Sequence, residues 1–106
     1  MSDPKPFNLG FTLQAEFQLT ILQRRGLIFG ASRRLATALA GIRRELQTNP
    51  REWGEATHTH RGMKCVAYVG YRDRIRVNYL VHESQLVVFV NTIEAEYGHP
   101  LHRQKE

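Results

Sequence analysis

The chain has 106 residues, of which 42% are hydrophobic and 24% are charged, and its formal net charge is +5. This length predicts a single domain, and the composition is typical of a folded globular protein. The one cysteine, Cys65, excludes an internal disulfide framework and a cysteine-rich zinc site. No run of about 18 apolar residues and no basic-then-apolar leader is present, so we expect no membrane partner and a cytoplasmic location.

The positive charge comes mainly from arginine, which accounts for twelve of the fifteen basic residues. Arginine pairs in a planar, bidentate way with phosphates and carboxylates. The charge therefore indicates a nucleic acid or an acidic protein as partner, and a merely solvated basic surface is the third reading. The charge falls into two patches, with seven basic and three acidic residues in 1–50, and five basic residues against Asp73 in 61–76.

The first half of the chain predicts a loose lead-in at 1–6, a short alternating strand at 7–11 and one or two helices. Segment 13–25 fits two patterns: Phe17, Leu19 and Ile21 alternate as in a strand, whereas Leu13, Phe17 and Ile21 lie on one side of a helix. In either case Gly26 is expected to end the element.

The next segment predicts an amphipathic helix that begins with Ser32 as its N-cap and stops at Asn49–Pro50. Its apolar positions recur at spacings of four, three and four residues, which indicates one buried side. These positions are Leu35, Leu39, Ile42 and Leu46.

The second half predicts a loop at 51–63, with a brief extended stretch as an alternative within it, and then three strands, at 64–71, 72–81 and 86–93. In 72–81, arginines 72, 74 and 76 are expected on one face and apolar residues on the other. Segment 86–93 is almost wholly apolar and predicts a central strand covered on both faces. The tail 94–106 predicts a short helix, an edge strand or disorder. The fold class is therefore α+β, with helices on one face of an antiparallel sheet.

Several segments, taken in order, resemble the RelE/ParE toxin superfamily, of which the chain would be a divergent member. They are FTLQAE at 11–16, ELQTNPREWGE at 45–55, HRGMKC at 60–65, RVNYLV at 76–81 and LVVFVNTI at 86–93. The resemblance spans about residues 7–97 and implies that 13–25 is helical. It implies a β-α-α-β-β-β domain at 7–97, with two helices on one face of a small, mainly antiparallel four-stranded sheet, and a C-terminal tail at 98–106.

The same resemblance implies the toxin half of a bacterial type II toxin–antitoxin pair. RelE-like members cleave mRNA, usually on the ribosome, whereas ParE-like members inhibit DNA gyrase by binding it. A RelE-like domain that has lost toxicity and only binds a partner is the third alternative. The implied partner is a cognate antitoxin, and the implied assembly is a homodimer or a toxin–antitoxin hetero-oligomer. No cofactor or metal is implied.

Cleavage by attack of a ribose 2′-OH on its phosphate needs a base, cations for the developing charge and an acid. Arg76 matches the family's phosphate-contacting arginine. The acid and base are expected among Glu96, His99 and His102, with Glu94 as an alternative to Glu96, because histidine titrates near neutrality. The expected RNA-binding cations are Arg61, Lys64, Arg72 and Arg74.

The sequence departs from the nuclease pattern where the family places lysines, since Ala67 and Val69 stand there. Glu96 occupies the place of an expected arginine, and a tail aromatic falls near His102, with Tyr97 close by. These departures weaken the nuclease reading, but RNA cleavage stays the first hypothesis and inhibition of gyrase by binding is the alternative. His58 and His60 would share one face of an extended segment, but no third ligand is placed beside them, so no metal site is predicted.

Overall fold

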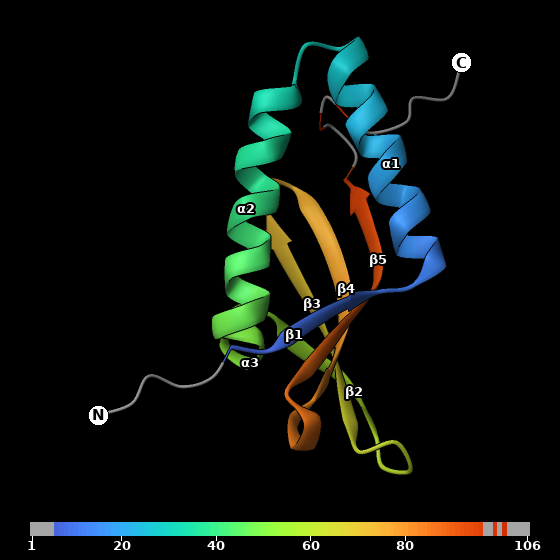
Figure 1. The fold of residues 1–106 in the computed structure, drawn as a ribbon, viewed down its shortest axis with the longest axis vertical. Helices are drawn as coiled ribbons and strands as arrows, with labels where there is room; N and C mark the ends of the chain where they lie inside the picture. The colour runs from blue at the N-terminus through green and yellow to red at the C-terminus, as the bar shows by residue number, and fades with distance from the viewer. Residues whose placement is uncertain (1–5, 97–98, 100, 102–106) are drawn as a thin grey trace.

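The computed structural model describes residues 6–96, 99 and 101. The strands are β1 (Asn8–Phe11), β2 (Glu55–His60), β3 (Cys65–Arg72), β4 (Ile75–His82) and β5 (Val87–Ala95). The helices are α1 (Leu13–Ile28), α2 (Ser32–Thr48), the short α3 (Pro50–Trp53) and a 3₁₀ turn, Glu83–Gln85. The strands form one sheet in the order β1-β5-β4-β3-β2, in which only β1 and β5 pair in parallel (Figure 1).

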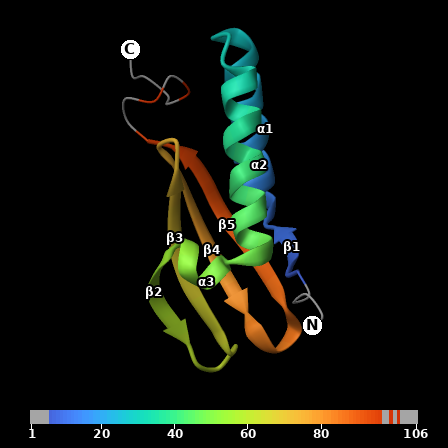
Figure 2. The same cartoon turned by 90° about the vertical axis from the view of Figure 1, so that its left-hand side faces the viewer.

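The predicted class is confirmed, because α1 and α2 lie side by side on one face of a mainly antiparallel sheet (Figure 2). The predicted strand count of four is wrong. The segment 51–63, expected to be a loop with at most a brief extended stretch, holds most of α3 and the whole fifth strand, β2. The sequence EATHTH of β2 lacks an apolar face, so its strand signal is weak until β3 pairs with it.

Segment 13–25 is helical, as the resemblance implied, and the Thr12 side chain caps α1 by accepting a hydrogen bond from the Ala15 amide. The helix continues past Gly26 to Ile28, so the predicted end is wrong. Gly26 is buried, with no side chain to separate α1 from the start of α2. The core side of α1 consists of Ala15, Leu22 and Gly26.

The apolar stripe that the sequence displays on α1 therefore faces outward. Leu13 is 85% exposed and Phe17 is 67% exposed. Because a helix cannot turn both sides to the core, burial of the small residues on one side leaves these larger side chains uncovered.

Helix α2 has its predicted buried stripe, in which Leu39 is partly covered and Leu35, Ile42 and Leu46 are buried. The prediction of Ser32 as N-cap is wrong. Ala31 holds that position and makes no side-chain capping bond. The predicted stop is confirmed: α2 ends at Thr48, and Pro50 opens α3 at a position where its missing amide costs nothing.

Strands β3 and β4 are joined by a turn of two residues, Asp73 and Arg74, both with positive φ (49° and 60°). Such a turn matches the twist of antiparallel strands. Arg34 of α2 donates two hydrogen bonds of 2.7 Å to the Asp73 carboxylate and ties the turn to the helical layer. The prediction of one strand through 72–81 is therefore wrong, because Arg72 ends β3 and β4 begins at Ile75.

The side chains of β4 alternate strictly between the two faces of the sheet. Ile75, Val77, Tyr79 and Val81 are buried beneath the helices, and the residues between them point to the other side. β5 lies between β1 and β4, but only its helix side is covered, since Phe89 on the other side is 44% exposed. The prediction that this strand is covered on both faces is wrong.

At the end of the core, Tyr79 stacks between Trp53 and Tyr68, with ring centroids 5.8 Å and 5.4 Å away. Its hydroxyl donates a hydrogen bond to the Pro50 carbonyl. Burial raises the pKa of the Tyr79 hydroxyl, which keeps it in the donating form. In the part of the chain that the structure describes, no helix is long and apolar enough to cross a bilayer.

Candidate functional site

The sheet face away from the helices is uncovered among the described residues, and we call it the open face. Cross-strand pairing places its members: Tyr71 opposite Arg76, and Arg76 opposite Glu94. Further along, Asn78 pairs with Thr92 and Leu80 with Phe89. Directly paired residues point to the same side of a sheet, so these side chains share one surface.

The polar centre of the open face is Arg76 with Glu94. The Arg76 Nη2 atom lies 3.7 Å from Glu94 Oε2, and the Arg76 Nε atom is buried with no hydrogen-bond partner among the described residues. Gln18 of α1 holds the other carboxylate oxygen through a 3.0 Å hydrogen bond from its Nε2 atom, while its Oε1 atom accepts from the Ile93 amide at 2.9 Å. The site thus has one cation and one carboxylate, positioned by a helix side chain.

The surroundings of this pair are partly apolar, since polar residues such as Asn78 and Thr92 share the face with the apolar ones. Ala67 and Val69, which replace the family's lysines, lie on the open face because they pair with Leu80 and Asn78. Phe89 lies over Gly10 of β1, where a Cβ atom would come within 2.8 Å of its ring. Tyr71 adds a second aromatic ring, 52% exposed. The open face is therefore suited to covering by a partner as much as to binding phosphate.

Arg72 and Arg74 do not share the face of Arg76, so that prediction is wrong. Arg74 lies in the turn, and Arg72 pairs with Ile75, which points to the helices. The guanidinium of Arg72 lies on Gly41 of α2, where a Cβ atom would come within 2.2 Å of its Nε atom. The two-residue turn is the cause, because it shifts the alternation that an unbroken strand would have kept.

Arg61 and Lys64 lie in the turn between β2 and β3, and Lys64 has a positive φ of 53°. The eight residues of β3 separate this turn from the Asp73–Arg74 turn, a distance of about 23 Å along the strand. The predicted RNA-binding cations therefore lie at three separate places, at the β2–β3 turn, at the Asp73–Arg74 turn and against Gly41 of α2, and not in one cluster around Arg76.

Of the predicted acid–base residues in the tail, Glu96 and His99 lie beside the Asp73–Arg74 turn. His99 is 4% exposed, accepts a hydrogen bond from the Leu101 amide at Nδ1, and has Nε2 4.0 Å from Asp73. Burial, with Arg34 nearby, lowers the pKa of His99. Glu96 follows β5 and donates its amide to the Arg74 carbonyl. These contacts join the tail to the turn, whereas His102 and Tyr97 lie outside the described residues.

Glu94, rather than Glu96, is the carboxylate beside Arg76. Sequence reasoning missed the roles of Gln18, Tyr71 and Phe89, because each depends on the pairing register or on a helix–strand contact that no local pattern reports. His58 and His60 lie on β2 with ring centroids 4.5 Å apart. Among the described residues, no group of three or more His, Cys, Asp or Glu side chains is placed to hold a metal ion.

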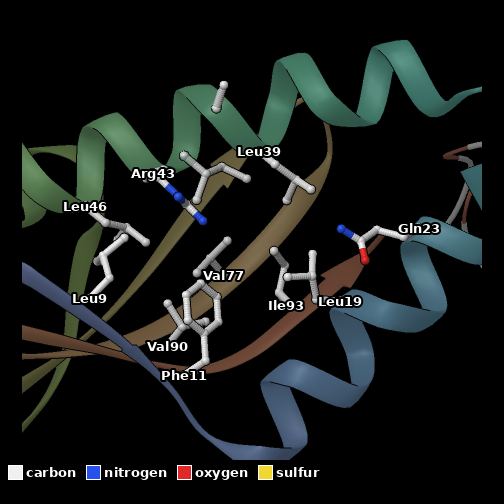
Figure 3. A pocket seen from close by; sticks show the side chains of 12 residues that line it. Leu9, Phe11, Leu19, Gln23, Leu39, Arg43, Leu46, Val77, Val90 and Ile93 are labelled. Atoms are coloured by element: carbon white, nitrogen blue, oxygen red, sulfur yellow. The ribbon is translucent and has the colours of Figure 1, made fainter.

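On the other side of the sheet, a cavity of about 280 Å³ lies between α1, α2 and the strands (Figure 3). Leu19 and Leu39 approach it from the two helices, and Val77, Val90 and Ile93 form its floor. Gln23 and Arg43 are the polar residues of its lining. The cavity forms because α1 and α2 meet at the buried Gly26 and diverge from there, while the sheet twists beneath them.

This order of strands and helices, with its antiparallel meander of four strands from β2 to β5, is a RelE-like fold, as the sequence resemblance predicted. A solved structure that shares it is a chain of the toxin–antitoxin complex RelBE2 from Mycobacterium tuberculosis, with a TM-score of 0.66. The likeness covers 91% of this chain and 98% of that chain at 17% sequence identity, which establishes the fold. No protein-family model and no curated protein matches the sequence.

The buried His99 predicts a pH dependence of stability. Its folded pKa is lower than that of the unfolded chain, so the unfolded state binds more protons near neutrality. We expect the free energy of unfolding to fall as the pH drops from about 8 to about 5.5, through the ordinary histidine range. His99→Gln should flatten this fall in urea unfolding curves, and His58→Gln, at an exposed position on β2, should not. An equal pH slope in wild type and His99→Gln would contradict the assignment.

Proposed function

We propose that the chain is the toxin component of a toxin–antitoxin pair and that it acts through its open face. The observation that carries the proposal is an uncovered, partly apolar sheet face, centred on Arg76, in a fold shared with a chain of the RelBE2 complex. A surface of this kind on a single small domain is typical of a protein that meets a macromolecular partner.

The geometry supports inhibition of a target by binding, with DNA gyrase as the implied target, better than it supports RNA cleavage. Cleavage needs several cations around one phosphate. Among the described residues Arg76 stands on the open face without a second cation from the predicted set, and Ala67 and Val69 are beside it. A partner protein that covers the apolar side chains of this face pays little desolvation energy, whereas a phosphate bound there would contact the guanidinium of Arg76 alone among the predicted cations.

Cleavage of mRNA, ribosome-dependent as in RelE-like toxins, is the second candidate. The observation that favours it is the buried Nε atom of Arg76, which has no hydrogen-bond partner among the described residues, together with the Nη2 atom of the same side chain 3.7 Å from Glu94 Oε2. In this mechanism Glu94 takes the proton of the ribose 2′-OH as that oxygen attacks the adjacent phosphorus. Arg76 stabilises the charge of the phosphorane, and the 5′ oxygen leaves with a proton from an acid.

An antitoxin partner follows from the same proposal. The helix-side cavity and the exposed Leu13 and Phe17 on α1 are apolar surfaces that a second protein would cover. The protein is basic, so we expect a short acidic or amphipathic chain, encoded beside this one.

Expression in a bacterial host distinguishes the modes of action. We expect growth arrest with DNA damage and intact transcripts. We expect Arg76→Gln to relieve the arrest, because it removes the positive charge that the described residues place at the centre of the open face. Arg24→Gln, an equal charge loss on exposed α1, is the control and should leave the arrest unchanged. Cleaved transcripts that disappear in Arg76→Gln would establish the nuclease instead. Normal growth with wild-type protein would contradict both and leave partner binding alone.

Co-expression with the product of the neighbouring reading frame tests the antitoxin. The two chains should purify together, and Leu39→Glu should release the partner because it places a carboxylate in the apolar cavity. Met63→Glu, on a side chain 61% exposed at the tip of the β2–β3 hairpin, should leave the complex intact. Retention of the partner by folded Leu39→Glu protein would show that the cavity is not its docking site.

A further inference from the structure

A basic strip follows the outer side of α2, away from the open face. Arg33, Thr37, Gly41 and Arg44 recur at spacings of four, four and three residues and therefore lie on one side of the helix. Arg72 reaches this side from the end of β3 and fills the place left by the missing side chain of Gly41. Arg33, Arg72 and Arg44 thus form one row, which we call the α2 strip.

Gly41 makes this arrangement feasible. A glycine inside a helix costs about 1 kcal/mol relative to alanine. Here any Cβ atom would lie 2.2 Å from Arg72 Nε and 2.4 Å from its Cζ atom. The guanidinium therefore lies directly against the helix backbone, where Arg72 is still exposed and can meet a ligand.

The strip carries excess positive charge. A shallow hollow of about 560 Å³ at its upper end is lined by Arg33, Arg34, Arg72 and Asp73, together with Thr37. The Asp73 carboxylate is committed to Arg34 through two hydrogen bonds of 2.7 Å. Among the described residues, Arg33, Arg44 and Arg72 form no ion pair.

The spacing of the strip suits a chain of phosphates. From Arg33 to Gly41, where Arg72 lies, the helix rises about 12 Å, and Arg44 lies about 4.5 Å further on. The positions between them are Thr37 and Gly41, without a large apolar side chain. Protein interfaces depend on buried aromatic and apolar anchors, which this strip lacks, whereas phosphate contacts require only cations and hydroxyl donors.

We propose that the α2 strip binds the phosphodiester backbone of a single-stranded nucleic acid, with Arg33 and Arg72 as its principal phosphate contacts. This site is separate from the open face, because Arg72 and Arg76 project from opposite sides of the sheet. It goes beyond the toxin function proposed above, and a toxin without it would still bind a target through the open face.

The test is fluorescence anisotropy of purified protein with a labelled 2′-O-methyl RNA of mixed sequence, which 2′-OH attack cannot cleave. Arg33→Gln combined with Arg72→Gln should weaken binding about tenfold and reduce the slope of log K against log salt by about 1.4, which is about 0.7 per lost phosphate contact. The control combines Arg24→Gln with Arg51→Gln, an equal charge loss at exposed positions of α1 and α3. Equal weakening of both double variants would overturn the proposal, and so would weakening of neither.

Gly41→Ala is a second variant that keeps every charge and displaces Arg72. It should weaken binding while favouring the helix, so a folding defect does not explain the loss. Unchanged binding by Gly41→Ala would overturn the role given to Arg72.

Inorganic phosphate, compared with chloride at equal ionic strength, separates a strand site from a site for one free phosphate. Complete displacement of the RNA by phosphate alone would contradict strand binding. Because no step depends on growth arrest, failure here leaves the toxin proposal untouched.

Discussion

The two-residue turn at Asp73 and Arg74 is the constraint on which the distribution of function depends. Both residues have positive φ, a backbone conformation that residues other than glycine adopt at some cost in energy. The bidentate contact from Arg34 compensates for that cost and lowers the pKa of the Asp73 carboxyl. Since the turn has two residues, Arg72 lies opposite Ile75, and the alternation of the following strand is fixed.

Two surfaces with different chemistry follow from this register. Arg76 joins Glu94 on a partly apolar face, whereas Arg72 crosses to α2 and joins the arginines of that helix. The positive charge is thus divided between the two sides of a thin domain. One side is suited to contact with a protein target, and the other is suited to contact with a chain of phosphates. The two surfaces do not overlap, so the domain can bind both partners.

The elements with strong internal periodicity were predictable, and those defined by contacts were not. The apolar stripe of α2 follows the helical period, and Arg76 was correctly expected opposite the buried residues of β4. The 73–74 turn was missed because it lacks the glycine or asparagine that marks such turns. Strand β2 has no apolar alternation, and the outward stripe of α1 is decided by which side packs better on the sheet. Glu94 beside Arg76 depends on the β4–β5 register, which no local pattern contains.

The central claim, that the turn separates Arg72 from Arg76, can be tested by interstrand nuclear Overhauser effects in uniformly labelled protein. The account predicts cross-strand contacts that pair Tyr71 with Arg76 and Val69 with Asn78, with residues 72 and 75 adjacent at the turn. A one-residue slip, in which residue 72 pairs with residue 76 across a three-residue loop, would place both arginines on one face and would contradict the account.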